Sequence, residues 1–253
     1  MDNTKRFSNR VENYVRYRPH YPTEIISFLK TKIAFAPHLT VADVGSGTGI
    51  SSEIFLQNGN TVYAVEPNEE MRKAAEKVFH DNKSFISVNA TAEATTLTDN
   101  SIDLIVAGQA FHWFDTIQCK KEFQRIAAPG AYLVLMWNEW KMESGFQKAY
   151  EKVLLDFAPD YENVGCRNAD EEALTEFFSP FPYFKHAFHN TQFFDFESLK
   201  GRLLSSSYAP LESDSTYEPM MTKLRQIFEE FSKDSQIEFE YSCKIYYGKI
   251  KQD

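Results

Sequence analysis

Short apolar runs rich in β-branched residues alternate with helical patterns through the first 137 residues of the chain. This alternation is typical of a parallel sheet with helices packed on its faces. The predicted strands are residues 41–44, 61–66, 85–89, 102–107 and 131–137.

Two of the helices predicted in this part of the chain have a candidate capping residue. Asn68 can cap one of them, because a short polar side chain can accept a hydrogen bond from the first helical turn. The apolar residues that follow Asn68 at helical spacing are Met71, Ala74, Ala75, Val78 and Phe79. Thr23 can cap the other helix, which leaves residues 1–22 as an additional N-terminal segment.

The alternation stops after Trp137. Residues 138–183 contain helical patterns broken by glycine and proline, which predicts a helical insertion or lid. From Trp140 to Phe196 the chain carries 14 of its 38 aromatic residues. These rings can form a small core under the insertion, a substrate pocket lined by rings, or both.

The C-terminal part, residues 184–253, is expected to complete the sheet. Residues 184–194 could form a strand, and apolar positions from Met220 to Phe231 mark a helix. Residues 237–247 alternate with a period of two, as in an antiparallel strand. We therefore predict one α/β domain with a core at 23–137 and a doubly wound, mostly parallel, seven-stranded sheet whose last strand is antiparallel.

The net charge and the cysteine spacing indicate which binding partners and which cellular compartment to expect. The chain of 253 residues has 27 Lys and Arg against 36 Asp and Glu, a net charge of -9. This gives no general attraction to nucleic acid or anionic membranes, and we expect neither as a partner. Cys119, Cys166 and Cys243 lack disulfide or zinc-site spacing, which fits a reducing cytoplasm. No signal peptide or membrane-length apolar run occurs, and a monomer or homodimer is expected.

The strongest chemical signal is a glycine-rich turn between the first predicted strand and a helix. Gly45, Gly47 and Gly49 alternate there, directly after Asp43. Glycine lets the backbone adopt a positive φ and approach a ligand closely. The dinucleotide fingerprint would need its third glycine at Ile50, and no P-loop Gly-Lys-Ser/Thr follows, so a phosphate-binding turn is not favoured.

Glu66 ends the second predicted strand, 17 residues after Gly49. An acid at that sheet edge can accept hydrogen bonds from both ribose hydroxyls, which predicts a ligand containing adenosine. The alternative is that Glu66 caps the next helix, a position for which Asn68 is better suited.

Taken together, these motifs resemble the class I S-adenosylmethionine-dependent methyltransferases, whose motif of an acid followed by three alternating glycines is met by Asp43 to Gly49. Within them the chain is similar to the type 11 small-molecule group that includes trans-aconitate methyltransferase-like proteins. The specific features are residues 13–22, the pair Ala92-Glu93 and residues 108–115, and the resemblance covers residues 7–137.

The resemblance implies transfer of a methyl group from S-adenosylmethionine to a small-molecule acceptor, such as a carboxylate or hydroxyl. The cofactor-binding residues that it implies are Asp43, Gly45, Ser46, Gly47, Thr48, Gly49, Glu66, Pro67, Thr91, Ala92, Glu93 and Gln109. Many relatives have Asp where this chain has Thr91, so adenine recognition would rest on the Ala92 backbone and apolar packing.

Methyl transfer mainly requires that acceptor, methyl carbon and sulfur be aligned in a dry site. His112, Trp113 and Phe114 follow the fourth predicted strand, at the sheet edge where ligands bind. We consider His112 a candidate general base, and Trp113 and Phe114 candidate walls of the acceptor site. The alternative is that all three simply seal the sheet edge.

The N-terminal segment supplies the other acceptor-site candidates, Tyr14, Tyr17 and Arg18. Arg18 could clamp an acceptor carboxylate with two charge-assisted hydrogen bonds. It could equally bind a backbone carbonyl or pair with an acid. The histidines show no clustering with carboxylates or thiols, so no metal is inferred.

Two other functions stay open at this stage. A catalytically silent module could keep the S-adenosylmethionine-binding fold, because function depends on the site. A nicotinamide-dependent oxidoreductase is less favoured, because the glycine spacing differs and no Tyr-x-x-x-Lys pair occurs.

Overall fold

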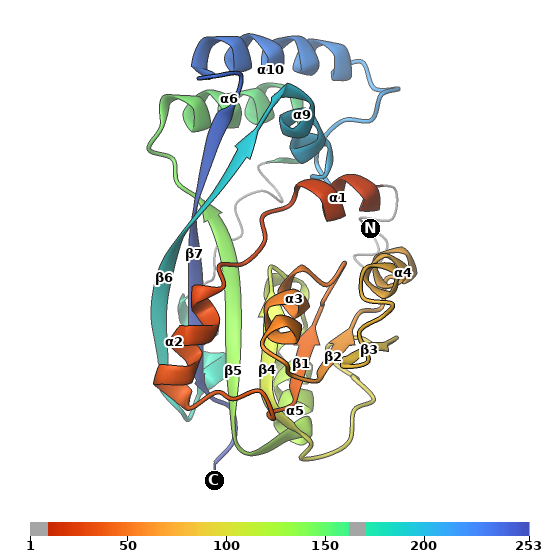
Figure 1. Ribbon diagram of the computed structural model, residues 1–253, viewed down its shortest axis with the longest axis vertical. Helices are drawn as coiled ribbons and strands as arrows, with labels where there is room; N and C mark the ends of the chain where they lie inside the picture. Colours follow the sequence, from red (N-terminus) through yellow and green to blue (C-terminus); the bar gives the residue numbers. More distant parts are fainter. Residues whose placement is uncertain (1–9, 162–170, 253) are drawn as a thin grey trace.

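A seven-stranded sheet with the strand order β3-β2-β1-β4-β5-β7-β6 forms the centre of the protein (Figure 1). The computed structural model describes residues 10–161 and 171–252. The strands are β1 (Val41–Val44), β2 (Val62–Val65), β3 (Phe85–Val88), β4 (Ile102–Gly108), β5 (Ala127–Trp140), β6 (Tyr183–Phe194) and β7 (Ile237–Lys249). Strands β1 to β5 pair in parallel, while β7 runs antiparallel to both β5 and β6, which confirms the predicted sheet.

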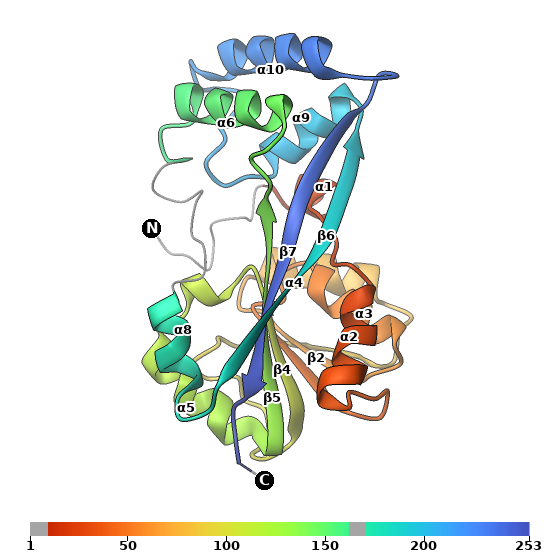
Figure 2. The same cartoon turned by 90° about the vertical axis from the view of Figure 1, so that its left-hand side faces the viewer.

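Helices cover both faces of the parallel strands (Figures 1 and 2). α2 (Glu24–Ile33) and α3 (Ile50–Gln57) pack on one face through residues such as Ile25 and Phe55. α5 (Thr116–Ile126) and α8 (Glu171–Phe178) pack on the other through Phe123 and Phe177. We refer to the parallel strands with α2, α3, α4 (Glu69–Val78), α5 and α8 as the lower lobe.

The two predicted helix caps differ in outcome. Asn68 caps α4, because its Oδ1 accepts a hydrogen bond from the Met71 N–H at 3.1 Å. Thr23 precedes α2 as predicted, but its side chain makes no capping hydrogen bond, since its own backbone is already helical. The start of α2 is instead determined by burial of its apolar face.

Strands β5, β6 and β7 are much longer than the others and extend beyond the lower lobe (Figure 2). Their far ends carry α6 (Gly145–Phe157), α9 (Phe196–Leu204) and α10 (Tyr217–Phe231). A second apolar core, separate from the cores of the lower lobe, fills the space between these helices and includes Tyr150, Leu224 and Phe239. We refer to α6, α9, α10 and the strand ends beneath them as the upper lobe.

Helix α1 (Val11–Tyr17) lies between the two lobes (Figure 1). Its Tyr17 ring packs so closely on Gly201 of α9 that any side chain at Gly201 would collide with it. The helix also contacts α4 of the lower lobe. None of its residues is fully buried, so α1 bridges the lobes without joining either core.

The predicted insertion, residues 138–183, does not act as one unit. β5 continues to Trp140, α6 belongs to the upper lobe, and α8 packs beside α5 on the lower lobe. The expectation of a lid made from this whole segment was therefore wrong for α8, because the apolar face of α8 packs in the core of the lower lobe. Cys166 lies outside the described residues. None of the helices in the described ranges is long and apolar enough to cross a membrane.

Candidate functional site

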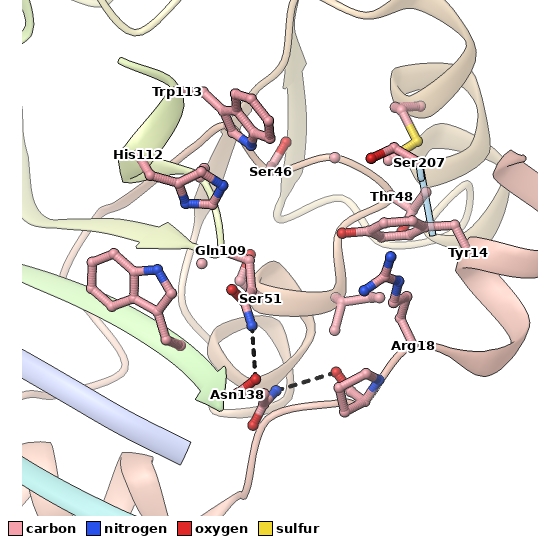
Figure 3. A pocket seen from close by; sticks show the side chains of 18 of the residues that line it. Tyr14, Arg18, Ser46, Thr48, Ser51, Gln109, His112, Trp113, Asn138 and Ser207 are labelled. Atoms are coloured by element: carbon pink, nitrogen blue, oxygen red, sulfur yellow. Dashed lines mark hydrogen bonds between the residues drawn. The ribbon is translucent and has the colours of Figure 1, made fainter. Parts of the chain in front are cut away.

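A cavity of about 520 Å3 lies between the lobes, at the carboxyl edge of the parallel strands (Figure 3). All of the predicted site residues line it except Asp43, Gly49 and Tyr17. The predicted residues that line it are Tyr14, Arg18, Gly45, Ser46, Gly47, Thr48, Glu66, Pro67, Thr91, Ala92, Glu93, Gln109, His112, Trp113 and Phe114.

The glycine-rich turn forms the floor of this cavity. Gly47 has φ of 56°, and a Cβ there would meet only the Met71 Cε atom, at 3.4 Å. Gly45 and Gly49 are different, because side chains at those positions would collide with Ala110 and Phe79. Packing against the protein thus accounts for the outer two glycines, whereas Gly47 leaves open space on the cavity side.

Two hydroxyl groups in the turn support the same interpretation. The Ser46 and Thr48 side chains are 5% and 4% exposed, and neither hydroxyl has a hydrogen-bond partner among the described residues. Buried hydroxyls are normally hydrogen-bonded, since leaving one unsatisfied is costly. The turn therefore offers both room and unused polar groups to a ligand.

Asp43 and Gly49 support the turn from beneath and do not line the cavity. Asp43 Oδ2 accepts hydrogen bonds from the Ser51 and Ser52 hydroxyls, both at 2.6 Å. Burial raises the pKa of Asp43 from its ordinary value of 3.8 to about 6, although these two hydrogen bonds oppose the shift. The predicted contact of Asp43 and Gly49 with a cofactor stays a prediction, because neither residue lines the cavity.

Glu66 joins the glycine turn to the loop that follows β2. Its Oε2 accepts a hydrogen bond from the Gly47 N–H at 2.9 Å, and its Oε1 accepts one from the Asn68 N–H at 2.7 Å. Burial raises the pKa of Glu66, while these backbone hydrogen bonds act in the opposite direction. Glu66 therefore has a supporting role, but Asn68, not Glu66, caps α4. Each carboxylate oxygen keeps a second lone pair for a ligand.

The segment after β3 forms another part of the wall. Ala92 is buried, whereas Thr91 is exposed. Glu93 Oε1 accepts a hydrogen bond from the Asp115 N–H at 3.0 Å, and Asp115 in turn caps α5. Glu93 thus positions the loop that carries His112 to Phe114.

The loop after β4 begins at Gln109, which has φ of 54° although it is not a glycine. Its Nε2 donates to the Asn138 carbonyl at 3.1 Å, and Asn138 Nδ2 donates to the Pro19 carbonyl at 3.4 Å (Figure 3). Strained backbone of this kind persists where its surroundings enforce it, often at functional sites. These contacts join β4, β5 and the segment that follows α1 around the cavity.

The short 3-10 helix η2 (Phe111–Trp113) brings His112 and Trp113 to one side of the cavity, with Tyr14 and Arg18 on the other side (Figure 3). The His112 and Trp113 ring centroids are 4.7 Å apart. Phe114 lines the cavity, but its ring also packs edge-on against Phe123 of the lower core. The packing alternative therefore holds in part for Phe114.

Arg18 follows α1 and reaches toward the end of α9. Its Nη2 donates to the Ser205 carbonyl at 3.2 Å and to the Ser206 hydroxyl at 3.4 Å, so one predicted alternative, a backbone-carbonyl contact, is present. Its guanidinium carbon lies 5.0 Å from the Tyr14 ring centroid. Tyr17 was predicted to bind the acceptor, but its ring packs on Gly201 because it faces α9.

Sequence reasoning missed the upper wall of the cavity. The additional residues there include Asn138, Trp140, Met142, Tyr161, Arg202, Ser207 and Tyr208. The sequence pattern could have identified Arg202, because this charged residue lies beside Leu199 and Leu203 on the apolar side of a helix. No group of three or more potential metal ligands occurs in the two described stretches.

The strand order, the antiparallel β7 and the glycine turn beneath the cavity define the class I methyltransferase fold. Residues 42–135 match the family model described as a methyltransferase domain.

Curated relatives with the same description match this chain over about half its length. An uncharacterized methyltransferase of Mycobacterium tuberculosis is 35% identical over 132 residues, which are 52% of this chain and 51% of the relative. An uncharacterized methyltransferase of Schizosaccharomyces pombe is 30% identical over 133 residues, 52% of each protein. The chain thus spans about half the length of the curated relatives that it matches.

Solved structures share the fold over most of the chain. A protein of Anaeromyxobacter dehalogenans, described as a type II methyltransferase, has a TM-score of 0.68 at 20% identity and covers 94% of this chain and 100% of its own. Geranyl diphosphate C-methyltransferase of Streptomyces coelicolor, solved with S-adenosyl-L-homocysteine, has a TM-score of 0.51 at 12% identity and covers 90% of this chain and 75% of its own.

Proposed function

We propose that this chain transfers a methyl group from S-adenosylmethionine to a small-molecule acceptor. The observation that carries the proposal is the floor of the cavity. There Gly47 leaves open space, Ser46 and Thr48 present hydroxyls that have no partner among the described residues, and the Glu66 carboxylate lies alongside.

These groups fit an adenosine-containing cofactor. Glu66 would accept hydrogen bonds from the ribose hydroxyls with its remaining lone pairs, and Ala92 would support the adenine ring. Bound S-adenosylmethionine supplies an electrophilic methyl group on a positively charged sulfur. The neighbour solved with S-adenosyl-L-homocysteine supports this choice of ligand.

The chain's own part in the reaction is to position the acceptor and exclude water. The two lobes would enclose the acceptor between the lower floor and the upper wall, with α1 between the lobes (Figure 1). The Trp113 ring can stabilise a nearby cation by about 0.5–2 kcal/mol. His112 lines the cavity, and its imidazole would take the proton if the acceptor atom is a hydroxyl, whereas a carboxylate acceptor needs no base.

Calorimetric titration tests the cofactor, and methyl turnover tests the reaction. The full chain is titrated with S-adenosylhomocysteine and, as a control, with NAD; we expect binding of the first only. Turnover of labelled S-adenosylmethionine is then measured on a panel of carboxylates and hydroxyl compounds. Binding without turnover on any acceptor would favour the silent-module alternative, and preference for NAD would overturn the proposal.

A further inference from the structure

Arg202 is a buried cation in the wall of the cavity. The side chain is 1% exposed, and its guanidinium carbon lies 5.5 Å from the Trp140 ring centroid and 5.6 Å from that of Phe239. Its Nε donates to the Tyr241 hydroxyl at 3.2 Å. Every one of these contacts is with a neutral group.

Arg18 approaches Arg202 closely. Both guanidinium groups donate to the same Ser206 hydroxyl, Arg202 at 3.5 Å and Arg18 at 3.4 Å. The Arg18 Nε is buried and has no hydrogen-bond partner in the part of the chain that the structure describes. Two cations thus share one neutral acceptor at the edge of the cavity.

Within the described ranges, neither arginine forms an ion pair with a carboxylate. The four glutamates of the cavity wall are engaged elsewhere. Glu66 accepts from Gly47 and Asn68, Glu93 from the Asp115 N–H, Glu151 from the Tyr161 hydroxyl, and Glu139 pairs with Lys244.

This arrangement is costly without an anion. A buried charge normally requires a partner of opposite sign, and two adjacent like charges repel each other. Burial, together with the nearby charge of Arg202, lowers the pKa of Arg18. A role for Arg18 in fastening α1 to α9 accounts for the hydrogen bond to Ser205, but not for its unpaired Nε or for the burial of Arg202.

We propose that the methyl acceptor is an organic anion whose carboxylate or phosphate group binds between Arg18 and Arg202. The apolar or aromatic body of the acceptor then lies against the Trp140 and Tyr208 rings of the upper wall. A guanidinium binds such oxyanions through paired N–H donors. This inference rests on the proposed function, since it assigns the substrate class of the same cavity.

The experiment uses the full chain saturated with S-adenosylhomocysteine. Phenylacetate, phenyl phosphate and the neutral phenylacetamide are titrated into it by calorimetry. We expect at least one of the two anions to bind at least about 10-fold more tightly than the amide. The tighter anion identifies the preferred headgroup, carboxylate or phosphate.

Three variants then locate the binding group. Arg18→Gln should weaken binding of the preferred anion by roughly 10- to 100-fold, with little change for the amide. Arg202→Lys keeps the positive charge but removes the planar pair of N–H donors, so it should also weaken binding of the preferred anion. Arg10→Gln is the matched control. Arg10 belongs to the same N-terminal segment as Arg18 and donates hydrogen bonds to the Leu204 and Ala209 carbonyls, but it does not line the cavity.

Equal binding of amide and anions, or an equal loss in Arg10→Gln and Arg18→Gln, overturns the inference. So does failure of both anions to bind when S-adenosylhomocysteine binds, an outcome that leaves the proposed function intact. If S-adenosylhomocysteine itself does not bind, the proposed function fails first. Arg18 is partly exposed, so its variant stays informative even where a change at buried Arg202 unfolds the upper lobe.

Discussion

Asp43 in the lower lobe and Arg202 in the upper lobe are both fully buried charged side chains near the cavity, but they have opposite sign and different support. The lower lobe buries Asp43, which is held by Ser51 and Ser52, only eight and nine residues further along the chain. The upper lobe buries Arg202, whose neighbours Trp140 and Tyr241 come from distant strands. The lower site is thus built from local contacts and the upper site from long-range ones.

The two lobes also differ in how far they match known relatives. The match to the methyltransferase domain covers residues 42–135 and ends before the chain enters the upper lobe. An anion beneath the floor and cations in the upper wall also suit the proposed pair of ligands, a sulfonium cofactor below and an anionic acceptor above. Under the proposed function, the cofactor would bind to the part of the chain that matches the family model, and the upper wall would select the acceptor.

The largest expected effect concerns the buried anion of the lower lobe. Between pH 4 and 6 folded Asp43 holds a proton that the unfolded chain has lost, because burial raises its pKa from 3.8 to about 6. The free energy of unfolding contributed by this group therefore falls as pH rises, by about 3 kcal/mol in all.

Urea unfolding of the native chain and Asp43→Asn at pH 4, 5, 6 and 7 measures this effect. The native chain should lose stability relative to the variant across that window. The same substitution at partly buried Asp103 serves as the control. A difference between native chain and Asp43→Asn that stays constant with pH would show that the burial of Asp43 is not the cause.

The next largest effect concerns the open space at Gly47. Gly47→Ala should weaken S-adenosylhomocysteine binding at least about 100-fold, or about 2.7 kcal/mol, because the new methyl group occupies the cavity floor. Gly59→Ala is the control, since Gly59 also has a positive φ, of 94°, but lies away from the cavity. Both variants should lose about 1 kcal/mol or more of stability from the left-handed backbone. If both variants bind S-adenosylhomocysteine with equal affinity, the cofactor does not bind at this turn.

Glu66→Ala is expected to weaken S-adenosylhomocysteine binding by about 30-fold, or about 2 kcal/mol, because it removes charged hydrogen bonds to the ligand. Asp115→Ala provides the comparison, since it removes a helix cap from α5 outside the cavity. Both variants should melt at lower temperature in scanning calorimetry. If Glu66→Ala lowers the melting temperature without lowering the affinity, then Glu66 only stabilises the glycine turn and the loop after β2 through its hydrogen bonds to Gly47 and Asn68.

Most of the lower lobe could be predicted from the sequence. Its strands are short and apolar, its glycine turn is contiguous, and Asn68 caps its helix from the adjacent position, so each signal is local. The mostly parallel pairing followed from the alternation of strands and helices, and the antiparallel β7 from the period of two in residues 237–247, whereas the strand order was not predicted. Thr23 failed as a capping side chain because packing of α2, rather than hydrogen bonding, sets that end.

The upper lobe could not be predicted in the same way. α6 and α9 are separated by α8, which packs on the other lobe, so no contiguous pattern marks the upper layer. Arg202 and Tyr208 reach the cavity only through the pairing of β5, β6 and β7. Tyr17 was placed in the site because its type and position suited an acceptor, whereas Gly201 provides the space that holds it against α9.

The smallest expected effect tests whether the upper wall acts on the acceptor alone. Tyr208 lines the cavity and packs edge-on against Tyr161, with ring centroids 5.0 Å apart. Tyr208→Leu should lower kcat/KM for an identified acceptor about 5-fold, or about 1 kcal/mol, because an aromatic contact with the acceptor is lost. Affinity for S-adenosylhomocysteine should stay within about twofold, since the floor of the lower lobe is unchanged.

Phe228→Leu is the matched control for this last variant. Phe228 packs on Phe196 inside the upper lobe, with ring centroids 5.6 Å apart, and does not line the cavity. It should lower the melting temperature of the protein while leaving kcat/KM within about twofold. If Phe228→Leu reduces kcat/KM as much as Tyr208→Leu does, then the rigidity of the upper lobe controls the reaction. Selectivity for the acceptor would then arise from how the lobes pack, and not from the rings that face the cavity.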